Sequence, residues 1–291
     1  MPRVPANGIE LEYEAFGHDR DPALVLIAGL GAQLIDWPVE FCEKLAAHGL
    51  RVIRFDNRDA GLSASLDTLG TPDLMAVLRG DQSTVAYLLA DMARDVAGLL
   101  DALGAGKAHV VGVSMGGMIA QQFAIDHPGR LLSLCSISST TGDPSVGQAT
   151  PIALAALGRP TAVSRDEAIQ GSAASSRVFG SPGFPVSDEE RLARAATKYD
   201  RSYRPAGRFR QIAAIAASPD RTSGLHDITG PAVVIHGEAD PLVGVSGGRA
   251  TAAAIPAAEL LVIPGMGHDL PRGAWPEIID AIVSNTAKAG A

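Results

Sequence analysis

The sequence has few cysteines, few aromatic side chains and no long apolar run among its 291 residues. Cys42 and Cys135 have no C-x-x-C spacing, so they indicate neither a zinc site nor a disulfide framework. Only 4% of the residues are aromatic, which argues against a surface that recognises bases or sugars by stacking. No apolar run approaches the roughly 18–20 residues of a membrane-spanning helix. Residues 1–10 lack the apolar core of a signal peptide, so we expect a cytoplasmic protein.

Basic residues are also fewer than acidic residues. Lys and Arg number 24 against 32 Asp and Glu, which gives a net charge of −8. Nucleic acids and anionic membranes attract positively charged surfaces, so neither is an expected partner. One stretch differs, because residues 159–210 hold ten basic and six acidic residues, a local charge of +4. Solvated helix faces are the preferred interpretation of this excess, and the rim of a substrate pocket is the alternative.

Hydrophobic residues make up 46% of the chain, enough for a large core, and their spacing predicts strands. Asn7-Gly8 favours the two positive φ angles of a tight turn, and Ile9–Ala15 alternates apolar and polar residues, so the chain starts with a β-hairpin. Short continuous apolar runs follow, as is typical of strands buried on both faces of a parallel sheet. These runs are Leu24–Ala28, Val52–Phe55, His109–Val113, Leu131–Ile137, Ala232–His236 and Leu260–Ile263.

Helical stretches lie between these runs. The clearest is predicted over Thr84–Leu103, where apolar residues recur at helical spacing and Gly104 ends the pattern. Strands and helices that alternate after an antiparallel start predict an α/β fold with a mostly parallel sheet. The alternation stops between residues 142 and 217, where capping boxes that begin at Ser164 and Ser187 predict at least two helices.

The strongest chemical signal is the sequence G-V-S-M-G-G around Ser114. It follows a predicted strand and precedes a predicted helix, which is the context of a nucleophile elbow with a G-x-S-x-G motif. The tight turn needs glycine at Gly112 and Gly116, because a Cβ atom there would collide with the backbone. A helix N-terminus also favours a developing anion, so we predict that Ser114 is a nucleophile.

A serine hydroxyl needs a base to remove its proton and a third group to orient that base. Asp240 lies in a loop just beyond the strand Ala232–His236 and is the predicted acid, with Glu238 as the alternative. His268 follows the last predicted strand in a glycine-rich loop and is the predicted base. The other six histidines lie at strand or helix ends and in polar turns, and no H-E-x-x-H spacing indicates a metal site.

The oxyanion of an ester hydrolysis needs preorganised N–H donors. The backbone N–H of Met115, directly after the nucleophile, is one candidate. The other is the N–H of Leu30 in the loop that follows the strand Leu24–Ala28; a simple flexible turn is the alternative for this loop. Farther along, Asp56 and Arg58 lie in a charged turn, and we expect them to hold that turn together rather than to act in catalysis.

Four segments together resemble the α/β-hydrolase superfamily over nearly the whole chain. They are G-V-S-M-G-G-M, R-F-D-N-R-D-A-G-L-S, H-G-E-A-D-P-L and P-G-M-G-H. A further segment, D-W-P-V-E-F at residues 36–41, makes the chain most similar to the aclacinomycin methylesterase-like group. Members of this group cleave a methyl ester from a polyketide. The chain differs from many relatives at Ala28-Gly29, where they have His-Gly. Because the proposed donor is a backbone N–H and not a side chain, we expect the oxyanion hole to be kept.

The resemblance implies a fold and a site. The fold is a twisted, mostly parallel sheet of about eight strands with helices on both faces and an inserted helical cap. The site comprises Ser114, Asp240 and His268 as a triad and the N–H groups of Leu30 and Met115 as the oxyanion hole. Because the triad residues flank the insertion, residues 1–141 and 218–291 form one catalytic core and residues 142–217 the cap.

The resulting hypothesis is a serine carboxylic-ester hydrolase that acts through an acyl-enzyme and needs neither cofactor nor metal. Its partner is a small-molecule ester, with a methyl ester of a polyketide-like or other hydrophobic acid as the candidate, and the protein is a monomer or homodimer. Hydrolysis of an enol-lactone or of a carbon–carbon bond with the same triad is the alternative, because S-M-G-G-M is similar to the enol-lactonase motif. A non-catalytic, ligand-binding member of the superfamily is the remaining hypothesis.

Overall fold

The computed structural model describes residues 1–290, within which an 8-stranded sheet has the order β1-β2-β4-β3-β5-β6-β7-β8. The β1–β2 and β2–β4 pairs are antiparallel, and the other neighbouring strands are parallel. The predicted α/β-hydrolase fold with a mostly parallel sheet is therefore confirmed. The strands are β1 (Arg3–Ala6), β2 (Ile9–Phe16), β3 (Ala23–Ile27), β4 (Arg51–Phe55), β5 (Ala108–Val113), β6 (Leu131–Ile137), β7 (Ala232–Gly237) and β8 (Ala258–Ile263).

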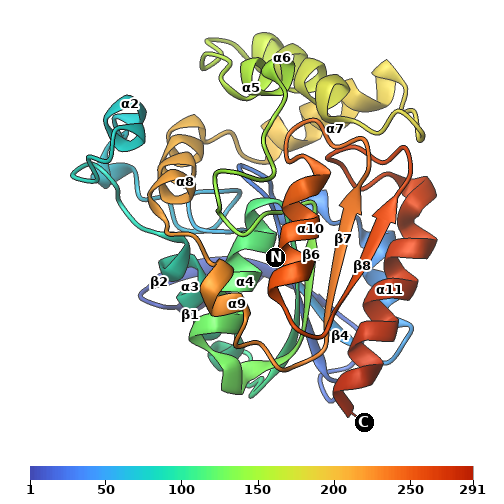
Figure 1. Ribbon diagram of the computed structural model, residues 1–291. Coiled ribbons are helices and arrows are strands. Elements are labelled where there is room, and N and C mark those ends of the chain that lie inside the picture. Colours follow the sequence, from blue (N-terminus) through green and yellow to red (C-terminus); the bar gives the residue numbers. More distant parts are fainter. Residues whose placement is uncertain (291) are drawn as a thin grey trace.

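Two helical layers cover the sheet (Figure 1). Val25 and Ile27 on β3 face a cluster with α3, α4 and the end of α10, whereas Leu24 and Leu26 face a cluster with α1 and α11. This alternation follows from the period of two along a strand. The helices are α1 (Val39–Ala46), α2 (Leu74–Leu78), α3 (Leu89–Ala102), α4 (Met115–Asp126), α5 (Pro151–Leu157), α6 (Arg165–Phe179), α7 (Asp188–Arg201), α8 (Pro205–Ala217), α9 (Thr222–Leu225), α10 (Val245–Ala254) and α11 (Trp275–Ala287).

The N-terminal hairpin is confirmed. Asn7 and Gly8 have φ angles of 48° and 79°, and Ala6 pairs with Ile9 across the turn. The prediction of burial on both faces is wrong for β8, where Leu260 is 41% exposed. The strand order explains the difference, because β8 is the last strand of the sheet and has a neighbour on one side only.

The predicted helix over Thr84–Leu103 is shorter in the structure, where α3 begins at Leu89. The Asp91 carboxylate accepts the Leu88 N–H (2.8 Å), and the distant Ser218 hydroxyl accepts the Leu89 N–H (3.0 Å). These bonds satisfy N–H groups that the first helical turn leaves without partners, so they fix the helix start at Leu89.

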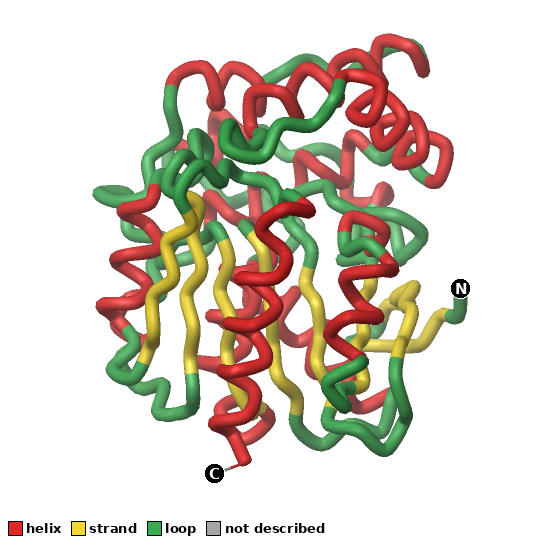
Figure 2. Tube along the Cα trace, turned by 90° about the vertical axis from the view of Figure 1, so that its right-hand side faces the viewer, coloured by secondary structure: helices red, strands yellow, loops and turns green. Residues whose placement is uncertain are grey.

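Between β6 and β7 the chain is mainly helical: α5 to α8 all lie within residues 142–217, called the cap segment below. Figure 1 shows α5, α6 and α7 above the sheet, and Figure 2 shows the same layer over the upper ends of the strands. The helices predicted from the capping boxes are confirmed, because Ser164 Oγ accepts the Glu167 N–H and Ser187 Oγ accepts the Glu190 N–H. The division into core and cap domains stays a prediction.

Within residues 1–290, no helix is long and apolar enough to cross a membrane.

Candidate active site

The turn between β5 and α4 holds Ser114 in a strained conformation. Its φ angle is +57°, which is rare for a residue with a side chain, and it is the N-cap of α4. A Cβ atom on Gly112 would lie 2.0 Å from the Gly116 carbonyl oxygen, and one on Gly116 would lie 2.1 Å from the Ile27 carbonyl oxygen. Both glycines of the motif are therefore required by the close approach of backbone, as predicted.

The structure brings the predicted triad side chains together, although they come from three separate loops. His268 Nε2 lies 2.9 Å from Ser114 Oγ, and His268 Nδ1 lies 2.7 Å from Asp240 Oδ2. With Nδ1 protonated, the ring donates to Asp240 and presents an acceptor to the Ser114 hydroxyl. Glu238, the alternative acid, is exposed and makes no hydrogen bond to His268 within the described chain.

The Asp240 carboxylate is buried and fully engaged. Its Oδ1 accepts the N–H groups of Leu242 and Val243, both at 2.9 Å, while Oδ2 accepts from His268. A second histidine, His236, lies behind it with Nε2 3.6 Å from Asp240 Oδ2 and 2.7 Å from the Val243 carbonyl oxygen. Burial lowers the pKa of His236, so its neutral ring donates to Val243 and holds the acid loop.

The cap segment contacts the loop that carries His268. The His268 N–H donates to the Phe179 carbonyl at the end of α6 (2.7 Å), and Ser181 Oγ accepts the Gly267 N–H (2.8 Å). The same Ser181 hydroxyl donates to the carboxylate of Asp269, whose pKa is raised by burial. A Cβ atom on Gly267 would lie 2.6 Å from the Phe179 oxygen, so this glycine is needed for close packing against the cap rather than for a positive φ.

Both predicted oxyanion donors lie beside Ser114. Met115 follows Ser114 at the start of α4, and its N–H has no acceptor in residues 1–290. The Leu30 N–H also has no acceptor there. A Cβ atom on Gly29 would lie 3.3 Å from Ser114 Cβ, which places the loop against Ser114 and explains why a small residue precedes Leu30. The role of these two N–H groups in the reaction stays a prediction.

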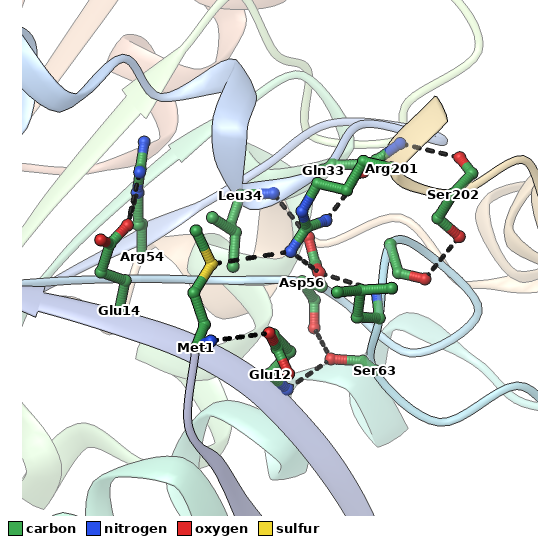
Figure 3. A network of polar contacts seen from close by, with 12 residues as sticks. Met1, Glu12, Glu14, Gln33, Leu34, Arg54, Asp56, Ser63, Arg201 and Ser202 are labelled. Atoms are coloured by element: carbon green, nitrogen blue, oxygen red, sulfur yellow. Dashed lines mark hydrogen bonds and ion pairs between the residues drawn. The ribbon is translucent and has the colours of Figure 1, made fainter. Parts of the chain in front are cut away.

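The Asp56 carboxylate bonds to its own turn and also to two other segments of the chain. Its Oδ2 accepts the Leu62 N–H (2.8 Å), as expected for a turn residue, and its Oδ1 accepts the Leu34 N–H (2.6 Å). Figure 3 shows Arg201 pointing at the same carboxylate, with Arg201 Nη2 2.7 Å from Asp56 Oδ2. Gln33 accepts from the other side of that guanidinium (2.7 Å). Asp56 therefore joins the turn, the loop after β3 and the end of α7.

Arg58 acts differently from the prediction. Its side chain does not bond within the turn but pairs with the buried Asp95 on α3, at 2.6 Å for both Nε and Nη2, and stacks over Tyr87. Burial raises the pKa of Asp95 and the pairing with Arg58 opposes that shift. Arg58 thus ties the turn to α3, and we assign neither Asp56 nor Arg58 a role in the chemistry.

The two cysteines and two cavities of the structure are not part of the triad site. The Cys42 and Cys135 thiols are buried and unpaired, and burial raises the pKa of Cys42 to about 12, so it is not a thiolate at neutral pH. In the described residues, no group of three His, Cys, Asp or Glu side chains could hold a metal ion. Cavities of about 490 Å³ between α1 and α11 and about 210 Å³ between α6 and α7 contain no triad residue.

Comparison with known proteins agrees with this geometry. Residues 22–271 match the model of the alpha/beta hydrolase fold family, so the chain belongs to that family and is a hydrolase. Within the family, it is 30% identical to rhodomycin D methylesterase DauP of Streptomyces sp. (strain C5) over 98% of both chains. The predicted resemblance to methylesterases is therefore confirmed.

Two further similarities come from other branches of the family. The chain is 30% identical to a 2-hydroxy-6-oxononadienedioate/2-hydroxy-6-oxononatrienedioate hydrolase of Burkholderia vietnamiensis, over 91% of this chain and 87% of that one. The solved structure of a thermophilic esterase from Thermogutta terrifontis superposes with a TM-score of 0.70 and 26% identity, with both chains covered completely. These similarities extend over most or all of the chain and agree with its place among the hydrolases of the family.

Proposed function

We propose that the protein is a serine carboxylic-ester hydrolase in which Ser114, His268 and Asp240 form the catalytic triad. Ser114 Oγ attacks the ester carbonyl carbon while its proton passes to His268 Nε2, and the N–H groups of Leu30 and Met115 bind the oxyanion. His268 then returns the proton to the departing alcohol, which leaves an acyl-enzyme. A water molecule gives a proton to His268 and attacks the acyl carbon, which releases the acid and regenerates Ser114.

The observation that carries this proposal is the continuous hydrogen-bond chain from Asp240 through His268 to Ser114. Its distances of 2.7 and 2.9 Å are within the range at which a base can take a proton from a nucleophile. The strained backbone of Ser114 supports the same role, because strain of this kind is concentrated at functional sites.

The substrate we propose is a methyl ester of a bulky hydrophobic acid. The similarity to a rhodomycin D methylesterase extends over 98% of the chain, so it includes the cap segment as well as the core. The net charge of −8 favours a neutral or cationic small molecule over an anionic polymer. The cytoplasmic location and the monomeric or homodimeric state stay proposals from the sequence.

A second candidate is hydrolysis of an enol-lactone or of a carbon–carbon bond beside a ketone. It is favoured by the 30% identity over 271 residues to a 2-hydroxy-6-oxononadienedioate hydrolase. The same three side chains would serve, so the triad geometry does not separate the two reactions. The substrates must therefore be compared directly.

The mechanism is tested with p-nitrophenyl butyrate and the variant Ser114→Ala. Loss of a triad member lowers turnover by roughly 10⁴- to 10⁶-fold. Ser133→Ala is the matched control, because Ser133 is a buried serine that bonds His109 and not the triad. Equal turnover by Ser114→Ala and wild type overturns the mechanism.

Substrate class is tested with a panel of hydrophobic methyl esters, enol-lactones and vinylogous diketones, with products identified by mass spectrometry. Release of methanol from the methyl esters at the highest kcat/KM supports the proposal. Faster ring opening or carbon–carbon cleavage supports the second candidate instead.

A further inference from the structure

The loop of residues 28–34, called the oxyanion loop below, depends on an ordered backbone for its proposed role. An N–H group stabilises an oxyanion only if it is already aimed at the reacting atom, because reorientation during the reaction would cost the energy that it supplies. Leu30 is in an irregular loop and not in a strand or helix. The orientation of its N–H is therefore set by whatever holds the neighbouring peptide groups.

The peptide groups Ala28–Gly29 and Gly29–Leu30 are held by one bond from a core side chain and one bond within the loop. Asn57 Nδ2 donates to the Ala28 carbonyl oxygen (2.9 Å), and the Asn57 side chain is buried. The Ala32 N–H donates to the Gly29 carbonyl oxygen (3.2 Å), which belongs to the same peptide group as the Leu30 N–H. These bonds leave the plane of the next peptide group to be fixed.

The peptide group after Leu30 is held by a side chain of the cap segment. Gln211 on α8 is 0% exposed, and its Oε1 accepts the Gly31 N–H at 2.8 Å. Gln211 Nε2 donates to the Arg58 carbonyl oxygen, also at 2.8 Å. Because a carbonyl oxygen accepts only a donor, this second bond fixes which end of the amide faces Gly31.

The helix that carries Gln211 is itself fixed against the core. The neighbouring Arg210 is 1% exposed and makes two bonds to the Asp59 carboxylate, at 2.7 and 2.8 Å. A Cβ atom on Gly207 would lie 2.2 Å from the Asp59 carbonyl oxygen, so α8 packs directly on the backbone of the turn. Gln211 therefore reaches the oxyanion loop from a rigid support.

We propose that Gln211 is a positioning residue for the reaction, which holds the Leu30–Gly31 peptide group so that the Leu30 N–H faces the oxyanion. This role rests on the proposed function, because it assumes that Leu30 is an oxyanion donor. The amide of Gln211 touches neither the substrate nor the triad; it acts through the backbone of the oxyanion loop. The cap segment thereby contributes to the rate of the reaction as well as to the shape of the site.

The experiment compares Gln211→Met with Gln121→Met. Gln121 is the other glutamine with 0% exposure, and its amide also makes two bonds, to Ser136 Oγ (3.1 Å) and Arg221 Nε (3.1 Å), two turns along α4 from Ser114. Both variants leave buried polar groups without partners, so they share a cost in stability. Only Gln211→Met releases the oxyanion loop.

Turnover of p-nitrophenyl butyrate is measured per active site, which is counted by labelling Ser114 with a fluorophosphonate. For Gln211→Met we expect kcat to fall roughly 10- to 100-fold with KM within about threefold of wild type, below the 10²- to 10³-fold loss of a whole oxyanion donor. Gln121→Met retains the wild-type kcat. If Gln211→Met does not fold, Gln211→Asn replaces it: the amide stays polar but is one methylene too short to accept from Gly31 while it donates to Arg58, and the same fall in kcat is expected.

Equal kcat for the Gln211 variant, Gln121→Met and wild type overturns the positioning role while leaving the proposed function intact. A fall confined to KM also overturns it, because that pattern indicates weaker substrate binding. A wild-type protein whose Ser114 is neither labelled nor required for turnover overturns the proposed function first, and the role of Gln211 with it.

Discussion

The sheet core and the cap segment are stabilised in different ways. In the core, Leu24, Val25, Leu26 and Ile27 of β3 are all fully buried between two helical layers. In the cap segment, the buried hydrophobic residues are almost all alanines, which bury little apolar area and so contribute little to stability. The core therefore holds its shape through apolar packing, and the cap segment depends on polar contacts for its place.

Those polar contacts explain the local positive charge of the cap segment. Lys198 lies 2.8 Å from Asp36, Arg201 2.7 Å from Asp56 and Arg210 2.7 Å from Asp59, and all three acids belong to the core. Part of the basic excess is thus neither a solvated face nor a pocket rim but a set of anchors. A change at these few positions should matter more than any other change in the cap segment.

The largest effect is expected from Arg210→Met. This variant leaves the Asp59 carboxylate buried without its cation, which should lower the free energy of unfolding by about 3–5 kcal/mol. Urea denaturation followed by circular dichroism measures the change. Adding Asp59→Asn to the same chain removes the unpaired charge and should recover part of the loss. A loss below about 1 kcal/mol would show that the cap segment is held by packing after all.

The second effect is a pH dependence of the free energy of unfolding, which we expect from the buried His109 in the core. Burial lowers the pKa of His109 from 6.5 to about 4. Between these values the unfolded chain binds a proton that the folded chain does not, so stability falls as the pH falls, by up to about 1.4 kcal/mol per pH unit. His109→Gln should flatten this slope between pH 6.5 and 4 in thermal melts, with His226→Gln, an exposed histidine, as the control. An unchanged slope contradicts the assignment.

A smaller effect is expected when a single methyl group is removed from the core. Ile278 on α11 is fully buried in the cluster with α1, and Ile278→Val should cost about 0.5–1.5 kcal/mol. Its kcat should stay at the wild-type value, because neither the triad residues nor their hydrogen-bond partners lie on α11. A fall in kcat without a change in folded fraction would show that core packing and catalysis are coupled.

The smallest effect is expected at a polar contact inside the cap segment. Arg165 and Asp200 pair at 2.6 Å between α6 and α7, but both side chains are about half exposed. Exposed pairs contribute little, so Arg165→Gln should change neither the melting temperature nor kcat measurably. A shift of more than about 2 °C would mean that polar contacts throughout the cap segment, and not its anchors alone, determine stability.

Much of the fold could be predicted because the signals are local. Apolar runs identify β3 to β7 within one or two residues, and Asn7-Gly8 identifies the hairpin turn. The start of α3 and the exposure of β8 could not be predicted in the same way. The first depends on Ser218, which is 129 residues away from Leu89, and the second on the order of strands in the sheet.

The same distinction applies to the candidate site. Ser114, Asp240 and His268 each follow a strand within a short motif, so the sequence alone identifies them as candidates. Gln211 and Ser181 belong to no such motif, and their contacts with the oxyanion loop and the His268 loop exist only once the cap segment is placed. The one signal in the sequence that could have drawn attention to Gln211 is its place as a polar, uncharged residue beside the Ala-rich end of α8.

The bond from the His268 N–H to the Phe179 carbonyl has a consequence for protein engineering. Exchange of whole caps between relatives is an obvious route to new substrate ranges, but it would also exchange part of the support of His268, the proposed base. The segments that can be transplanted freely are those between the anchors, residues 151–178 and 188–197. A chimera that keeps residues 179–183 and 198–211 of this chain should keep its catalytic rate while its selectivity follows the donor.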